Sequence, residues 1–480
     1  MSSCLQPRFG LLSLIAIYVV LSLFWIGFAY GVAPNILIAA YNEQSLTILN
    51  WVFQGHRSLP VEHFLERWSV IAAAVLIASI LHFLIVMFIE NIDGKYRLRL
   101  VDTPKSALCS NSVLIAFSAA FLGLTATSWA RGDYSGYLYE WSLILDGHDP
   151  WYRPPYPGHP FNAYGPLFNA LAPLVLVNPL VNKLLFAFSY LVYLIWLIKD
   201  FAPHRGFVAL SWPWLGLWLL NPFPWVEIAY FGYFDVLVAI ACVAAVQSLI
   251  SRKDGVSGSC LGLGILLKFM PIVILPFLVF SERRVHFRLL SFCVGLVIFG
   301  LVVSVLIWGT STFFPLMFAA TRYSHWSIYN ILNSTYSPLR LFWHSTNSVS
   351  LDWLERACLV TAGLGVFAWC MLRRTGPALS AILAVLVTLL FYRVGYINYQ
   401  MVPFLLISYW MVSGGKRFEE HSTLVALIGG YFIVLAGLEL VHWSILTEEN
   451  LYSDIVMFKF LLGCALLIGL FRFSASGRFN

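Results

Sequence analysis

Charged residues are scarce in this chain of 480 residues, where Asp, Glu, Lys and Arg together make up 11%. A soluble domain is about a quarter charged and about half apolar. Here 60% of the residues are hydrophobic, and the mean hydropathy is +0.80. The composition therefore excludes an ordinary soluble domain and predicts an integral membrane protein.

Other features are missing as well. The net charge of +6 is spread over short loops, which argues against nucleic-acid binding. None of the eight cysteines lies in a long polar loop, so no external disulfide framework is expected. The first apolar run, about 10–33, is too long for a signal-peptide core and is interpreted as a first span. We find no internal repeat of the kind that many transporters carry.

The apolar segments predict an all-α, polytopic fold. A spanning helix needs about 20 mostly apolar residues. About twelve segments qualify: 10–32, 68–90, 107–129, 182–199, 207–221, 225–250, 288–309, 352–372, 377–394, 398–413, 423–442 and 452–472. We interpret 1–480 as a single membrane domain in which 1–106 forms an extra N-terminal two-helix segment.

The positive-inside rule orients these segments, because Lys and Arg concentrate in cytoplasmic loops. The basic segment 91–105 should therefore be cytoplasmic, and the span after it leads outward. Two long segments, 130–165 and 310–351, then become extracytoplasmic loops, and both termini are cytoplasmic. If 165–180 is part of an external re-entrant element, the remaining basic connections fall on the cytoplasmic side: Lys199, Arg205, Arg252, Lys253, Arg283, Arg284, Arg288, Arg373, Arg374, Lys416 and Arg417.

One apolar run, 256–281, conflicts with this rule because both of its flanks are basic. A single crossing would place one basic flank outside, whereas two half-height helices keep both inside. Pro271 favours a break, since it removes a helix hydrogen bond and disfavours helix at the residue before it. We predict a re-entrant or broken element with Lys268 near its tip, facing a site. The alternative is a Pro-kinked span whose Lys268 snorkels to the interface.

The first long loop opens with the stretch RGDYSGYLYEWSLILDGHDPWY at 131–152. Its aromatic and aliphatic residues recur at helical spacing and predict a surface helix over 133–147 whose apolar stripe faces the membrane. The stripe consists of Tyr134, Tyr137, Leu138, Trp141 and Leu145. Gly147 is a natural stop for this helix. The helix would hold Asp133 at the boundary between lipid and water.

Four acids lie in this loop, and each has an ordinary explanation. Asp133 is an N-cap, a general base, or both. Glu140 is expected on the solvated side of the helix, and Asp146 at its terminal turn. Asp149 either makes an Asx-turn before a proline or supports the site. Asp133 is the residue to which we assign chemistry.

The ordered motifs resemble those of the GT-C superfamily of membrane glycosyltransferases. The similarity is to bacterial polyprenol-phosphate-mannose-dependent mannosyltransferases and to the glycosylphosphatidylinositol mannosyltransferase I family. The motifs are Asp133-Tyr134, LILDGHDPWY (143–152), AYGPLF (163–168), NPFPWVEIAYFGYFDVLVAIACVAA (221–245), GLGILLKFMPIVILP (262–276) and YINYQMVPFLLI (396–407). The chain departs from the family in two ways: it has three spans, not one, before the loop, and a single acid where some relatives have two.

The resemblance implies an inverting transfer of a hexose, mannose in these relatives, from a polyprenyl-phosphate donor to an acceptor hydroxyl on the extracytoplasmic face. The resemblance also implies that the acceptor is a glycolipid or glycan and that the protein lies in the inner membrane of a bacterium. An acceptor hydroxyl needs a positioned base. The leaving phosphate is already a stable anion, so one carboxylate suffices, unlike the pair used in glycoside hydrolysis.

The phosphate and the sugar require cations and oriented donors. The candidate substrate-binding residues are Asp149, Tyr164, Lys268, Arg131, Arg153, Arg322, His325 and Arg393. The segment around Arg322 and His325 either binds the phosphate and the sugar or is an aromatic segment at the membrane interface with polar anchors. Glu227 and Asp235, near or inside a span, are functional candidates or partners of basic residues that stabilise the bundle.

No cluster with metal-ligand spacing is present, so no cofactor is predicted, although the single acid leaves a divalent metal open. A transporter or flippase of lipid-linked sugars is the main alternative function. It would favour repeats and paired charges at mid-bilayer, whereas the polar density here lies in the loops. A non-catalytic scaffold leaves the acidic loop and Lys268 unexplained.

Overall fold

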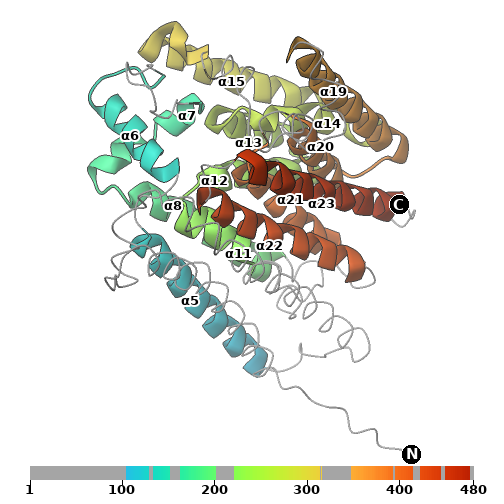
Figure 1. Cartoon of the computed structure of the whole chain (residues 1–480), viewed down its shortest axis with the longest axis horizontal. Coiled ribbons are helices and arrows are strands. Elements are labelled where there is room, and N and C mark those ends of the chain that lie inside the picture. Colours follow the sequence, from blue (N-terminus) through green and yellow to red (C-terminus); the bar gives the residue numbers. More distant parts are fainter. Residues whose placement is uncertain are drawn as a thin grey trace, which may run out of the picture.

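A computed structural model describes residues 104–128, 133–151, 163–201, 221–313, 315, 348–392, 395–414, 422–444 and 449–475 of the chain. Within these ranges every regular element is helical, as the sequence predicts. Figure 1 shows a bundle in which α5 lies at one edge and α6 and α7 sit beside the ends of other helices.

The elements follow one another along the chain with short breaks. In order they are α5 (Pro104–Thr127), α6 (Asp133–Leu145), α7 (Pro166–Asn169), η2 (Ala172–Leu176), α8 (Val181–Ile195), η3 (Trp196–Phe201), α11 (Pro222–Pro224), η4 (Trp225–Tyr230), α12 (Asp235–Ile250), α13 (Asp254–Leu267), η5 (Met270–Ile274), α14 (Leu275–Val279), η6 (Ser281–Arg283), α15 (Phe287–Trp308), η7 (Gly309–Phe313), α19 (Ser348–Arg373), α20 (Pro377–Phe391), η8 (Asn398–Gln400), α21 (Met401–Gly414), α22 (Ser422–Ser444) and α23 (Glu449–Ala475). Here η3 and η4 are π-helical, and the other η elements are 3₁₀ helices.

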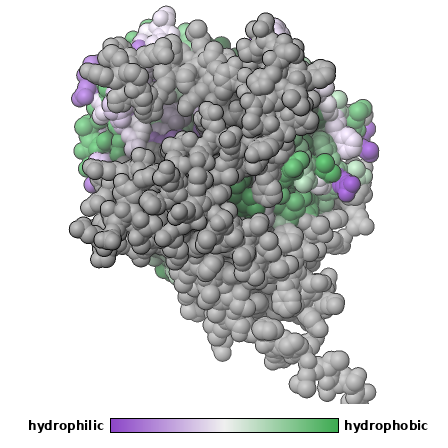
Figure 2. Space-filling model, in the orientation of Figure 1, coloured by the Kyte–Doolittle hydropathy of each residue, from purple (hydrophilic) through white to green (hydrophobic). Residues whose placement is uncertain are grey.

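Three described helices are long and apolar enough to cross a membrane: Val181–Ile198, Phe287–Phe313 and Arg356–Arg373. They coincide with three of the predicted spans. The outer face of α15 carries exposed apolar side chains such as Phe299 and Leu306, which suits contact with lipid. Apolar residues also reach the described surface in Figure 2. The total of about twelve spans stays a prediction, and 10–32, 68–90 and most of 207–221 lie outside the described residues.

The core forms around α20, which is apolar and buried along almost its whole length. A helix that is hydrophobic all round belongs in the interior of a bundle. It contacts α12, α19, α21 and α23. These neighbours place the start of α12 and the η8–α21 junction beside one another, at one end of the bundle.

The predicted break in 256–281 is present. α13 ends at Leu267, and Lys268 takes an extended conformation with φ −155° and ψ 128°. The chain continues through η5, with Pro271 in its first turn, and then α14. Since α13 packs in parallel against α15, with Gly258 against Leu289 and Gly262 against Cys293, residues 268–286 must return to the end where α13 began.

Two contacts close this hairpin at its base. Arg252 Nη2 lies 3.2 Å from Glu282 Oε2, and His286 Nδ1 lies 3.0 Å from Asp254 Oδ2. Both basic flanks therefore share one end of the bundle, and Lys268 stands at the opposite end. This agrees with the predicted broken element and its tip. Lys268 is only 3% exposed, so the alternative of a snorkelling lysine is wrong. The depth of the hairpin in a membrane stays a prediction.

The predicted surface helix is present as α6, and Gly147 stops it with a φ of +81°. Its surroundings differ from the prediction. Tyr134, Tyr137 and Trp141 are at most 1% exposed within the protein itself. They pack edge-on or stacked against aromatic rings from other elements, among them Phe168 and Phe234. The stripe therefore faces protein, and the expectation that it faces the membrane is wrong.

Candidate functional site

A buried ion pair lies at the tip of the hairpin. Lys268 Nζ donates a 2.6 Å hydrogen bond to Asp235 Oδ1, and both side chains are almost fully buried. Asp235 begins α12, directly after the turn that follows η4. The pairing arises because α12 and α13 run antiparallel. Asp235, the first residue of α12, therefore lies beside Lys268, the residue that follows the end of α13. Asp235 is thus a partner of a basic residue, one of the two roles that the sequence left open.

The η8–α21 junction covers this pair from another direction. Asn398 Nδ2 donates a 3.3 Å hydrogen bond to Asp235 Oδ2. Lys268 Nζ lies 3.6 Å from the centre of the Tyr399 ring, close enough for a strong cation–π interaction. The motif at 396–407 therefore contributes directly to the environment of Lys268, although the sequence assigned no role to Asn398 or Tyr399.

The end of the first long loop packs onto the same tip. Gly165 N donates a 3.0 Å hydrogen bond to Leu267 O. A Cβ at Gly165 would lie 2.1 Å from Leu266 O, so only glycine permits this approach. The contact carries Tyr164 to the lysine, and Lys268 Nζ is 5.8 Å from the centre of the Tyr164 ring. The sequence motif AYGPLF is thereby tied to the lysine motif.

Asp133 opens α6 and remains half-buried. Its charge is near enough to interact with Tyr164 and Lys268, and with Glu140 on its own helix. Burial raises the pKa of Tyr164 well above its usual range, and the charges of Asp133 and Glu140 raise it further. Asp133, Tyr164 and Lys268 are far apart in the sequence, yet they lie within electrostatic range of one another in the fold.

Asp149 stabilises a turn in the first long loop. Its Oδ1 accepts a 2.9 Å hydrogen bond from Trp151 N, which is the predicted Asx-turn. The indole of Trp151 in turn donates a 3.1 Å hydrogen bond to Tyr164 O. Asp149 thus contributes to the position of Tyr164 through Trp151. Asp146 is exposed at the end of α6, as expected.

Glu140 is where the sequence interpretation fails. It is 3% exposed, and its Oε2 has no hydrogen-bond partner in the described structure. Burial raises the pKa of the Glu140 carboxyl well above its usual range, and the nearby charge of Asp133 raises it further. The expectation of a solvated Glu140 is wrong, because Glu140 lies at the edge of the apolar stripe of α6 and is buried with it, while Ser135 and Ser142 stay exposed.

Further buried charges escaped the sequence analysis. Lys183, which is fully buried, donates hydrogen bonds of 2.7 Å to Ser128 Oγ and 2.6 Å to Tyr230 O. Gly232, with a φ of +72°, leaves room for the Lys183 side chain. Glu439 accepts a 2.9 Å hydrogen bond from Tyr233. Lys183 and Glu439 each place a charge inside a predicted span, and this feature of the sequence could have identified both as buried, partnered residues.

The other candidate residues lie outside the described residues: Arg131, Arg153, Arg322, His325 and Arg393. Among the residues that are described, no group of three or more His, Cys, Asp or Glu side chains could hold a metal ion. Glu227 is fully buried on the π-helical η4, and neither carboxylate oxygen has a hydrogen-bond partner in this part of the chain. π-helical turns occur frequently at functional sites.

Comparison with known families gives one match. Residues 162–393 match the model of glycosyltransferase family 87, which is slightly under half of the chain. No curated protein matches the sequence. The match includes Tyr164, Asp235 and Lys268 and begins after Asp133. It indicates a glycosyltransferase of GT-C-like membrane type, in agreement with the apolar helices.

Proposed function

We propose that this protein transfers a hexose from a polyprenyl-phosphate-sugar donor to an acceptor hydroxyl with inversion, on the extracytoplasmic face of a bacterial inner membrane. The sugar proposed is mannose, and the acceptor a glycolipid or glycan. The family match supports glycosyl transfer. The observation that supports a catalytic site in the first loop is the proximity of Asp133 to Tyr164 and Lys268, and the donor, sugar and membrane follow from the family resemblance.

Asp133 is the proposed general base. A hydroxyl is a poor nucleophile at neutral pH and gains from a carboxylate that accepts its proton as the bond forms. Asp133 is the acid of α6 that is neither fully buried, as Glu140 is, nor at the far end of the helix, as Asp146 is. It can therefore meet both a lipid-linked donor and an acceptor.

Lys268 is the proposed ligand of the donor phosphate. An ammonium group has three N–H donors. One of them is used by Asp235, the single hydrogen-bond acceptor of Lys268 Nζ among the described residues. The others are left for phosphate oxygens, and the buried setting strengthens such a contact. Asp235 and Tyr399 would hold the ammonium in place before the donor arrives.

The test replaces one carboxylate without changing its size. Membranes containing the Asp133→Asn variant should lose sugar transfer from labelled polyprenyl-phosphate-mannose by about 100-fold or more. Asp146→Asn removes the same charge from the exposed end of the same helix and should retain wild-type transfer. Retained activity in Asp133→Asn at wild-type protein levels removes Asp133 as the base.

The donor class has its own test. The wild-type protein, reconstituted in vesicles, should transfer sugar from the polyprenyl-phosphate donor and not from a nucleotide sugar. Movement of the lipid-linked sugar between leaflets without any transfer product would favour the flippase alternative. Chelation of divalent metals in the same assay decides whether a metal takes part.

A further inference from the structure

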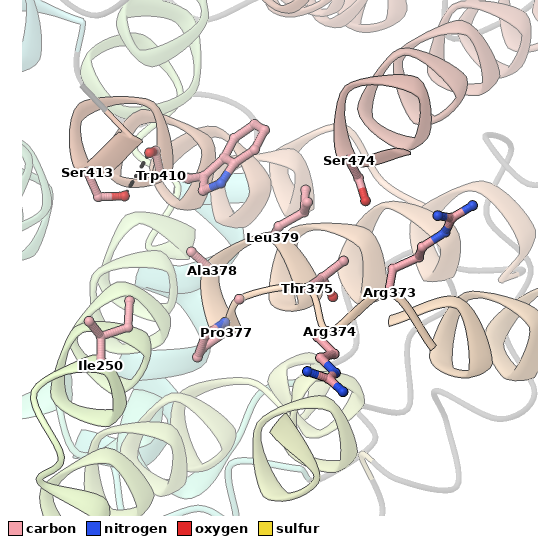
Figure 3. A pocket seen from close by; sticks show the side chains of 11 residues that line it. Ile250, Arg373, Arg374, Thr375, Pro377, Ala378, Leu379, Trp410, Ser413 and Ser474 are labelled. Carbon is pink, nitrogen blue, oxygen red and sulfur yellow. Dashed lines mark hydrogen bonds between the residues drawn. The ribbon is translucent and has the colours of Figure 1, made fainter. Parts of the chain in front are cut away.

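A pocket lined by two arginines lies at the end of the bundle opposite Lys268. It has a volume of about 380 Å³ and forms where the end of α19 turns into α20. The ends of α12, α21 and α23 complete it, each contributing a side chain such as Ile250, Trp410 or Ser474. Figure 3 shows these side chains gathered around the turn at 373–377. The pocket shares the end of the bundle that holds the base of the hairpin, away from Lys268.

Two arginines line this pocket without an acidic partner. Neither Arg373 nor Arg374 forms an ion pair within the described structure, whereas Arg252 at the same end pairs with Glu282. Arg373 stacks on Trp369, with 4.9 Å between its guanidinium carbon and the ring centre. Arg374 is exposed and has a φ of +54°, which is uncommon for a residue with a side chain. Among the described residues, the pocket therefore gathers two positive charges that no carboxylate pairs with.

The first turn of α20 adds hydrogen-bond donors. Pro377 is the first residue of the helix, and no side chain caps it. Hydrogen bonding of the turn begins with Ser380 N, which donates to Gly376 O. The amides of Ala378 and Leu379, both lining the pocket, have no acceptor in the part of the chain that is described. Such amides and the positive end of the helix favour an anion.

Much of the remaining lining is apolar, with Ile250, Ala378, Leu379 and Trp410, beside the hydroxyl groups of Thr375, Ser413 and Ser474. A free inorganic anion would gain no favourable contact from these apolar side chains. The volume is also in the range that suits a drug-sized molecule. Arg373 and Arg374 leave the turn in different directions, so a ligand that reaches both must extend along it (Figure 3). The lining therefore fits a ligand with an anionic head and an apolar tail.

We infer that this pocket binds the phosphate-bearing head group of an anionic membrane phospholipid. One arginine and the α20 amides contact the phosphate, the other arginine contacts the rest of the head group, and the apolar residues contact the start of the acyl chains. Basic pockets between membrane helices on the cytoplasmic side bind such head groups. The inference does not rest on the proposed catalysis, because no residue of the pocket belongs to the Asp133–Lys268 region.

The experiment measures lipid retention. The full-length protein is placed in nanodiscs of mixed phosphatidylglycerol and phosphatidylcholine, and lipids that stay bound after release are counted by native mass spectrometry. We expect wild-type protein to retain phosphatidylglycerol preferentially. The Arg373→Gln/Arg374→Gln variant should lose this retention by about tenfold or more. Arg284→Gln removes an exposed charge at the same end, outside the pocket, and should behave as wild type.

A second variant keeps both charges. Gly376 has a φ of −64°, and an added Cβ meets no atom within 4 Å. Gly376→Leu should therefore fold and reduce retention by occupying the pocket. Wild-type retention in the double arginine variant, or equal retention of the two lipids by wild-type protein, overturns the proposal. So does full displacement of the lipid by millimolar inorganic phosphate, which would identify a simple anion site.

Discussion

The ammonium of Lys268 and the carboxylate of Asp235 form a 2.6 Å ion pair at the tip of a hairpin, away from solvent. A buried pair is not in itself evidence of high stability, but the loss of one partner leaves an uncompensated charge. The pair therefore makes the tip of the hairpin sensitive to single substitutions.

Removing the lysine should be costly. Lys268→Met leaves Asp235 buried without its cation, and we expect a loss of about 3–5 kcal/mol in the free energy of unfolding. Denaturation in detergent measures it. Arg252→Gln, which breaks an exposed pair at the base of the hairpin, should change stability by about 1 kcal/mol or less. The double variant Lys268→Met/Asp235→Leu should recover much of the loss, and a failure to recover contradicts this account.

Gly165→Ala tests the contact between the loop and the hairpin. Its Cβ would lie 2.1 Å from a backbone oxygen, which cannot move aside as a flexible side chain can. We expect a destabilisation of about 1–3 kcal/mol, together with lower transfer activity because Tyr164 is displaced. Gly123→Ala in α5, where an added Cβ meets nothing within 4 Å, is the matched control. Equal melting temperatures for the two variants would exclude the tight approach.

Glu140 should make stability depend on pH. Its pKa is raised in the folded protein, so below its ordinary pKa both states hold the proton. As pH rises above that value, the unfolded chain loses the proton while the folded protein keeps it. The free energy of unfolding therefore falls with rising pH, by at most about 1.4 kcal/mol per unit, until the folded carboxyl also ionises. Glu140→Gln should remove this slope in melting curves recorded across pH, and an unchanged slope would argue against a buried acid.

The two ends of the hairpin should label from the same side of a membrane. In a background without native cysteines, Ser251→Cys and Arg284→Cys should react together with an impermeant maleimide in inverted vesicles. Both positions are exposed at the base of the hairpin. Asp146→Cys, on the exposed end of α6, should react from the opposite side. Labelling of residues 251 and 284 from different sides would contradict the hairpin.

The features that sequence predicted best were local. The end of α6 at Gly147 and the break at Lys268 follow from single residues whose backbone preferences are strong. The positive-inside rule predicted that the hairpin returns to the end of the bundle where it began, since a single crossing could not place both basic flanks on the same side. The family resemblance added Tyr164 and Lys268 as parts of one site.

Burial of the acids was not predictable in the same way. The periodicity of one helix shows which face is apolar, but not whether a second segment covers the other face. Glu140 lies at the edge of the apolar stripe of α6, and the packing of other segments extends burial over this edge. Tyr399 contacts Lys268, and Asn398 contacts Asp235, from far along the chain, and no local pattern indicates either contact. These contacts depend on the packing of the whole bundle.

The parallel packing of α13 and α15 has a consequence for the rest of the chain. A segment that leaves one end of a bundle and returns to it adds an even number of passes. Counting 256–281 as a single crossing would invert the assigned sidedness of every later helix, from α15 to α23. Removing the hairpin would delete the lysine while leaving the parity of the remaining passes unchanged. The hairpin thus brings a cation to the site without altering the orientation of the later helices.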